Sequence, residues 1–148
     1  FVLQPDSKAP RAAFLSQSDV VGQALDLVAN LAVSSDAPVV STLSLASLAG
    51  MVAGPVLALL AGSRAVLFGP FSSQSFIATL DAVGRCHLAA PETIGPDLAQ
   101  AGIGVRLEGL ALGRAAGAAA TPYGRIGCPT ALIEAGGDGH LAITRPAA

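Results

Sequence analysis

APVVSTLSLASLAGMVAGPVLALLAGS, residues 37–63, lies between Asp36 and Arg64 and contains no charged residue. Its first part, residues 39–43, is short and rich in β-branched side chains, which favours a buried strand. The longer part, residues 45–61, is rich in Leu and Ala, which favours a buried helix. We therefore predict a strand followed by a helix at the centre of the fold, with the rest of the chain packed around this pair.

An uncharged stretch of this length also fits a membrane span, because about 18 apolar residues can cross a bilayer. Against that alternative, hydroxyl side chains dilute the first half of the stretch and Pro55 interrupts the second half. Neither end carries a cluster of Lys and Arg or a belt of Trp and Tyr. We therefore predict no membrane span, and we interpret Gly50 and Gly54 as positions where the helix lies close to a sheet.

Composition narrows the classes of function. The chain has 148 residues, enough for one domain with a sizeable core, and a net charge of −2, which does not favour nucleic acid as a partner. Hydrophobic residues make up 52% of the chain and charged residues only 12%, so we expect an apolar surface that meets a protein partner or a second copy. Cys86 and Cys128 have no metal-binding spacing, and no secretory signal is visible. We expect reduced thiols, no metal and a cytoplasmic location.

The flanking segments alternate between strand-like and helix-like patterns. Strands are predicted at residues 1–3, 11–15, 65–68, 86–90, 105–111, 130–134 and 140–144, and helices at 18–30, 73–83 and 92–101. Most of the connections are too long for hairpins, which indicates parallel strands joined by crossovers. The sequence thus predicts an α/β fold, a layered, mostly parallel sheet with covering helices, in a single domain over residues 1–148.

Finer patterns predict which side chains face the core. Phe71 and Phe76 stand at the positions of a hydrophobic staple around Ser72, the expected N-cap of a helix. Apolar spacing in that helix predicts an inward stripe of Phe76, Ile77, Leu80 and Val83. Residues 105–111 alternate between apolar and polar side chains, which predicts a half-exposed strand.

Histidine and serine offer weak grounds for catalysis. His87 lies in a predicted buried strand, which favours a neutral, hydrogen-bonded core histidine over a catalytic base. Ser47, His87 and Asp138 could be combined on paper into a nucleophilic triad, but no GxSxG motif supports a nucleophile. We therefore predict no catalytic residue.

Several segments carry a family resemblance, in chain order. They are PRAAFLSQ at 10–17, SLASLAG at 44–50, LLAGSRAVL at 59–67, the helix at 71–82 and HLAAP at 87–91. In order and spacing they resemble the PKGVxLTH, PLFHxxG and LLAGATVVL motifs, the following helix and the THLxxVP motif of AMP-forming acyl-CoA synthetases. The resemblance implies part of that family's N-terminal α/β domain, with ATP, Mg²⁺ and CoA as the cofactors of a complete ligase.

The segment resembling the phosphate-binding loop departs most from the family pattern. The family loop, TSGTTGxPKG, uses glycines that let backbone N–H groups approach the ATP phosphates. Residues 3–12 here read LQPDSKAPRA, without a glycine and with a proline and an acid in the middle. The resemblance leaves Ser7, Lys8 and Arg11 as the vestige of this loop.

Two other family motifs are also reduced. Where the family has PLFHxxG beside the acyl pocket, this chain has Ala46 and Ser47 in place of the aromatic residue and the histidine, so Ser47 and Gly50 are the vestigial pocket residues. The acidic YGxTE motif has a faint counterpart at 134–138, with Asp138 as its vestigial acid. The pair Tyr123-Gly124 is a second counterpart, without the acid.

These losses predict a noncatalytic, degenerate acyl-CoA-synthetase-like domain that acts as a structural or assembly module and holds no cofactor. One alternative is part of an acyl- or aryl-CoA ligase that activates a carboxylate as an acyl-adenylate, with the missing groups supplied outside this chain. A second alternative is a small-ligand binding module that uses the pocket near Ser47 without chemistry.

Overall fold

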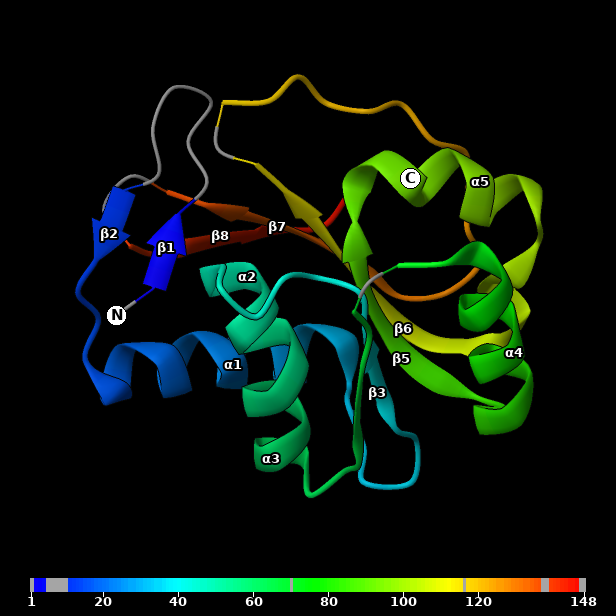
Figure 1. Ribbon diagram of the computed structural model, residues 1–148, viewed down its shortest axis with the longest axis horizontal. Helices are drawn as coiled ribbons and strands as arrows, with labels where there is room; N and C mark the ends of the chain where they lie inside the picture. The colour runs from blue at the N-terminus through cyan, green and yellow to red at the C-terminus, as the bar shows by residue number, and fades with distance from the viewer. Residues whose placement is uncertain (1, 5–10, 70, 116, 137–138, 147–148) are drawn as a thin grey trace.

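Six strands form the central sheet of the computed structural model, in the spatial order β4-β3-β5-β6-β7-β8 (Figure 1). The structure describes residues 2–4, 11–69, 71–115, 117–136 and 139–146. The strands are β3 (Val39–Ser41), β4 (Ala65–Leu67), β5 (Cys86–Pro91), β6 (Leu107–Arg114), β7 (Thr130–Ala135) and β8 (Leu141–Thr144). The first five are parallel to one another, and β8 is antiparallel to β7. The predicted α/β class and the mostly parallel sheet are confirmed.

Helices cover both faces of this sheet. One face is covered by α1 (Gln17–Leu31) and by the helical run α2 (Leu48–Met51), η1 (Val52–Val56) and α3 (Leu57–Ala61). The other face is covered by α4 (Ser73–Val83) and α5 (Gly95–Gln100), with short 3₁₀ turns at η2 (Glu92–Ile94) and η3 (Ile103–Arg106). A separate antiparallel pair, β1 (Val2–Gln4) and β2 (Arg11–Ala13), lies at the α1 end of the molecule (Figure 1).

The uncharged stretch forms the predicted strand and helix, but the helix is not uniform. Ser47 caps its first turn, and Gly62 ends it in the left-handed region at φ 67°. Between these ends, η1 is a π-helical turn that contains Pro55. A proline has no backbone N–H and its ring crowds the preceding turn, so a local change of helical hydrogen bonding accommodates it. The prediction of one helix from 45 to 61 therefore becomes three consecutive segments from 48 to 61.

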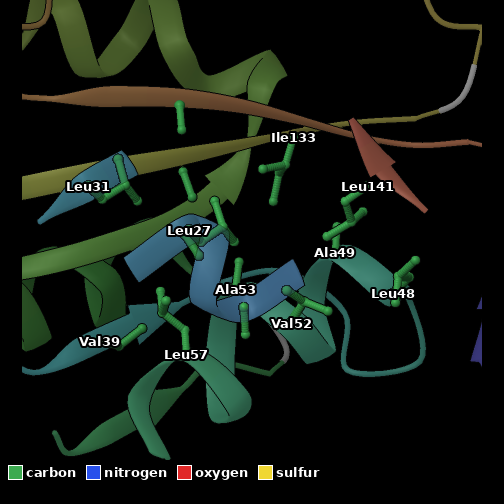
Figure 2. Close-up of a cluster of buried hydrophobic side chains, with 14 of the residues drawn as sticks. Leu27, Leu31, Val39, Leu48, Ala49, Val52, Ala53, Leu57, Ile133 and Leu141 are labelled. Carbon is green, nitrogen blue, oxygen red and sulfur yellow. The ribbon is translucent and has the colours of Figure 1, made fainter. Parts of the chain in front are cut away.

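The larger hydrophobic cluster lies between this helical run, α1 and the sheet, as Figure 2 shows. Leu27 of α1, Val52 of η1 and Ile133 of β7 are fully buried there. Gly54 also lies close to the sheet, because a Cβ atom on it would come within 3.3 Å of the Ser41 side chain of β3. This contact confirms the interpretation of Gly54 as a position of close helix–sheet approach.

Three finer predictions were wrong. Ile77 is 56% exposed, because the inward face of α4 is narrower than its apolar spacing suggests and is filled by Phe76 and Leu80. Strand β6 begins at 107 and is largely buried, because β5 and β7 flank it on both sides and helices cover both faces. Gly50 meets the Ser44 carbonyl of the preceding loop instead of the sheet. In the part of the chain that the structure describes, no helix combines the length and apolarity that a bilayer crossing needs.

Candidate functional site

The carboxyl ends of β5, β6 and β7 bring three charged side chains together. Glu92 directly follows β5, Arg114 is the last residue of β6, and Glu134 lies near the end of β7. The strand registers produce this meeting, because Pro91 pairs with Gly113 and Arg114 pairs with Glu134. In open α/β sheets this edge is where ligands bind, so the cluster occupies the place of a candidate functional site.

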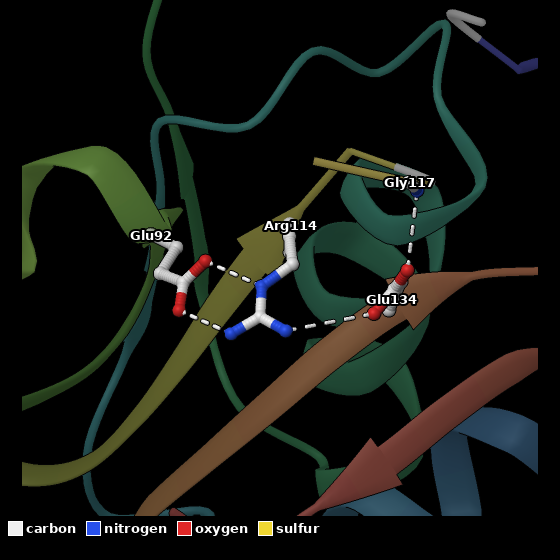
Figure 3. Close-up of polar contacts among 4 residues, drawn as sticks. All are labelled: Glu92, Arg114, Gly117 and Glu134. Atoms are coloured by element: carbon white, nitrogen blue, oxygen red, sulfur yellow. Dashed lines mark hydrogen bonds and ion pairs between the residues drawn. The ribbon is translucent and has the colours of Figure 1, made fainter. Parts of the chain in front are cut away.

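Arg114 joins the two carboxylates, as Figure 3 shows. Its Nε donates to Oε2 of Glu92 and one terminal nitrogen donates to Oε1, both at 2.6 Å, which is a bidentate pair. Its other terminal nitrogen lies 3.7 Å from Oε2 of Glu134. The Glu92 side chain is 4% exposed, that of Arg114 17% and that of Glu134 35%, so the network runs from the interior to the surface.

This geometry favours the charged forms of Glu92 and Arg114. The hydrogen bonds from Arg114 hold the pKa of Glu92 below its usual value, against the opposing effect of burial. The hydrogen bond to Glu92 raises the pKa of Arg114 in turn. Two carboxylates therefore face one guanidinium, and the cluster as a whole carries a net charge of about −1. Such a cluster does not attract anions such as a triphosphate or a carboxylate.

A long connection between β6 and β7 passes over this edge of the sheet and is tied to the same cluster (Figure 1). The backbone N–H of Gly117 donates to Oε1 of Glu134 at 3.3 Å, and the backbone of Thr121 hydrogen-bonds to Glu92. Further along, the ring of Tyr123 lies against Gly95 at the start of α5, where a Cβ atom on that glycine would come within 3.0 Å of the ring. Burial raises the pKa of Tyr123.

Ser47 and Gly50 lie in the loop and first turn that follow β3. The Ser47 hydroxyl donates to the Ser44 carbonyl at 2.7 Å and accepts the Gly50 N–H at 3.1 Å. A Cβ atom on Gly50 would lie 2.0 Å from the same carbonyl oxygen, so only glycine fits. The polar groups of both residues are thus engaged in starting the helix.

The chain superposes on several solved structures. No protein-family model matches the sequence, and no curated protein matches it. MatB from Rhodopseudomonas palustris superposes with a TM-score of 0.71 at 14% identity. The match covers 97% of this chain and 30% of MatB. A mutant of o-succinylbenzoate CoA synthetase from Bacillus subtilis superposes with a TM-score of 0.65 at 18% identity. That match covers 80% of this chain and 25% of the synthetase. A long-chain-fatty-acid-CoA ligase from Archaeoglobus fulgidus superposes with a TM-score of 0.64 at 13% identity. That match covers 90% of this chain and 30% of the ligase.

The chain has the fold of part of an acyl-CoA synthetase. It spans about a quarter to a third of the length of these three structures. The likeness agrees with the family resemblance of the sequence motifs, and it covers both the helical run of the uncharged stretch and the sheet.

Several of the residues that resemble acyl-CoA synthetase motifs lie outside the described residues. These are Ser7 and Lys8 of the vestigial phosphate loop and Asp138 of the vestigial acidic motif. Arg11 begins β2, and its backbone pairs with Gln4 of β1, but its side chain is likewise outside the description. Strand β1 lies against α2, so the flank of the phosphate-loop segment is brought close to Ser47 and Gly50.

His87 lies far from Ser47 along the sheet. It is the second residue of β5, at the amino ends of the strands, whereas Ser47 follows the carboxyl end of β3. The on-paper triad is therefore not assembled. His87 is buried as predicted, but the predicted hydrogen bond is wrong, because neither ring nitrogen has a partner among the described residues. The same part of the chain contains no His, Cys, Asp and Glu cluster able to hold a metal ion.

Sequence reasoning missed Glu92 and Arg114. A signal was present, because Glu92 directly follows one apolar strand and Arg114 ends another, in a chain with few charges. Charged side chains at the carboxyl ends of neighbouring parallel strands meet at one edge of the sheet. What the sequence did not supply was the register that sets Arg114 beside both carboxylates.

Proposed function

We propose that this chain is a noncatalytic segment with the acyl-CoA synthetase fold that serves as a structural or assembly module. The observation that carries the proposal is the Glu92–Arg114–Glu134 network, which occupies the ligand edge of the sheet and pairs its one guanidinium with both carboxylates. The engagement of Ser47 in capping its own helix also supports it. In this function the groups at the usual site positions hold the fold together instead of binding substrate.

The apolar surface supports the assembly role. Leu59 and Leu60 of α3 and Leu67 of β4 are 78%, 36% and 43% exposed, and β4 is an outer strand of the sheet. We call these three residues the α3–β4 rim. Exposed leucines beside an open strand edge favour contact with a protein partner or a second copy. The free thiols of Cys86 and Cys128 favour a reducing location such as the cytoplasm.

Nucleotide binding tests the noncatalytic function. Isothermal titration of the 148-residue chain with ATP and Mg²⁺ should give no binding heat, and carboxylate-dependent pyrophosphate release should be absent over aliphatic and aromatic carboxylates. An intact acyl-CoA synthetase in the same assay serves as the positive control. Micromolar ATP binding by the chain would overturn the proposal.

Size-exclusion chromatography with light scattering tests the assembly role separately. The chain should elute as an oligomer or with a bound protein. Leu59→Ser should shift the elution toward the monomer without changing the circular dichroism of the chain. Ile77→Ser, an exposed apolar residue on α4 outside the rim, is the matched control and should leave the elution unchanged. A monomer at every concentration, with no partner recovered, contradicts this role.

A second candidate function is part of a working CoA ligase, in which the remaining catalytic groups come from outside this chain. The observation that favours it is the likeness to MatB, one structure of which contains ATP and superposes with a TM-score of 0.64 at 16% identity. If a longer protein containing this chain releases pyrophosphate in the presence of a carboxylate, this candidate replaces the first.

A further inference from the structure

His87 is buried in the sheet without a hydrogen-bond partner. Its exposed fraction is 2%, and neither Nδ1 nor Nε2 has a partner among the described residues. It lies on β5 between β3 and β6, where Val39 and Gly109 are its register partners. A buried polar group that forms no hydrogen bond lowers stability even when neutral, and a buried charge lowers it further.

The imidazole ring lies close to Gly109 of β6 and to the last residue of α1. A Cβ atom placed on Gly109 would lie 3.0 Å from Nδ1 of His87, 3.3 Å from Cβ of Leu31 and 3.4 Å from the Leu31 carbonyl oxygen. The ring, the glycine and the last residue of α1 therefore converge on one point. The absent side chain of Gly109 makes room for the imidazole, and Leu31 covers it.

The charged groups around the ring offer an imidazolium little compensation. On β6, Glu108 is the carboxylate that acts on the ring, but it is paired with Arg85 at 2.6 Å and is partly exposed. On β5 itself the neighbouring thiol of Cys86 is neutral, because burial raises its pKa to about 11. Asp26 of α1 and Asp36, which lies between α1 and β3, are exposed. Burial accordingly lowers the pKa of His87, with Glu108 opposing.

We propose that His87 is an acid-sensitive switch that releases the end of α1 from the sheet when the imidazole is protonated. The neutral ring is tolerated beneath Leu31, whereas an imidazolium would be buried with both N–H groups unbonded, because in the closed packing neither ring nitrogen is hydrogen-bonded to any described residue, the nearby Leu31 carbonyl oxygen included. Opening at Leu31 exposes the ring to solvent and removes the cost of burying its charge. The inference is independent of the proposed function, since it concerns the opposite end of the sheet from the Glu92–Arg114–Glu134 network.

The direction of the pH dependence follows from proton linkage. Below the ordinary histidine pKa of about 6.5, the open state binds a proton that the closed state resists, so acid favours opening. The opening equilibrium constant should rise by up to about tenfold for each pH unit between about pH 6.5 and pH 5. Above that range the histidine is neutral in both states and the slope should vanish.

Hydrogen exchange over this pH range tests the switch. After correction for intrinsic rates, amides of α1 near Leu31 and of β5 should lose protection as pH falls from about 7 to about 5. His87→Gln and His87→Leu should abolish this slope, whereas His140→Gln, which removes the exposed histidine, should retain it. Nuclear magnetic resonance titration of His87 in the unmodified chain gives a readout that does not depend on variant folding, and it should show a pKa below that of an unfolded reference. A flat profile in the unmodified chain, or a slope retained in both His87 variants, would overturn the proposal.

Discussion

Glu92 becomes a buried carboxylate only because the chain turns into η2 directly after β5. We expect Glu92→Gln to lower the free energy of unfolding by about 2–3 kcal/mol, because it weakens two charge-assisted hydrogen bonds in a buried position. Urea denaturation at neutral pH measures this change. Asp81→Asn is the matched control, since it also converts an arginine-paired carboxylate into an amide, but in an exposed pair with Arg106, and it should cost no more than about 1 kcal/mol. Equal losses of unfolding free energy in the two variants would mean that burial of the network adds nothing to stability.

Gly50 gives a second prediction at the scale of a single residue. Gly50→Ala should destabilise the chain by about 3 kcal/mol, because the added methyl group would overlap the Ser44 carbonyl oxygen. Gly22→Ala in α1, where nothing lies within 4 Å of the added atom, should instead stabilise by about 0.5–1 kcal/mol through helix propensity. Thermal unfolding of the two variants measures the opposite signs. A stable Gly50→Ala variant would show that the loop can move away.

Single residues were the hardest feature to predict from the sequence. Gly50 was correctly predicted to lie close to another part of the backbone, but the predicted neighbour was the sheet and the observed one is the Ser44 carbonyl. Local spacing does not say which backbone faces a helix. His87 was correctly placed in the core, whereas its missing hydrogen bonds depend on Gly109, which is distant in sequence. Which residues lie side by side on neighbouring strands depends on the strand register, and the apolar pattern of this chain does not determine that register.

At the scale of elements, Gln23 joins α1 to the outer strand β8. Its Oε1 accepts the backbone N–H of Leu141 at 2.7 Å in a buried position. Gln23→Ala should cost about 1–3 kcal/mol, because it leaves that N–H without its acceptor, and should accelerate hydrogen exchange in β8. Asn30→Ala should have little effect, since its side-chain amide donates to the Asp26 carbonyl oxygen of the same helix. Unchanged exchange in β8 after Gln23→Ala would contradict the role of this contact.

Most elements could be predicted because their signals are local. The capping box of Ser16 and Asp19 begins α1, and the staple of Phe71 and Phe76 forms with ring centroids 5.6 Å apart. The π-helical turn at Pro55 could not be placed, since a proline in an apolar run predicts a break as readily as a bulge. Burial of β6 was missed because it depends on the neighbours β5 and β7 and not on its own pattern.

For the whole molecule, Glu92 should dominate the loss of stability in acid below the histidine range. Its pKa is lower in the folded chain than the ordinary value of 4.5, so the unfolded chain takes up the proton first as pH falls. The stabilisation is therefore complete above about pH 4.5 and is lost as pH falls through the folded pKa. Urea denaturation from about pH 5 to about pH 3 should show a shallower decline for Glu92→Gln than for the unmodified chain. Parallel declines would assign the acid sensitivity to other carboxylates.

The spatial order of the strands also determines the order in which they can join the sheet during synthesis. From β5 onward each new strand is added beside the one before it, through β6 and β7 to β8. A nascent chain emerging from the ribosome can therefore extend the sheet strand by strand, without inserting a late segment between two that have already paired. Until residues 141–144 have emerged, β7 is the outer strand on this side of the sheet, and its unpaired backbone groups are available to another strand.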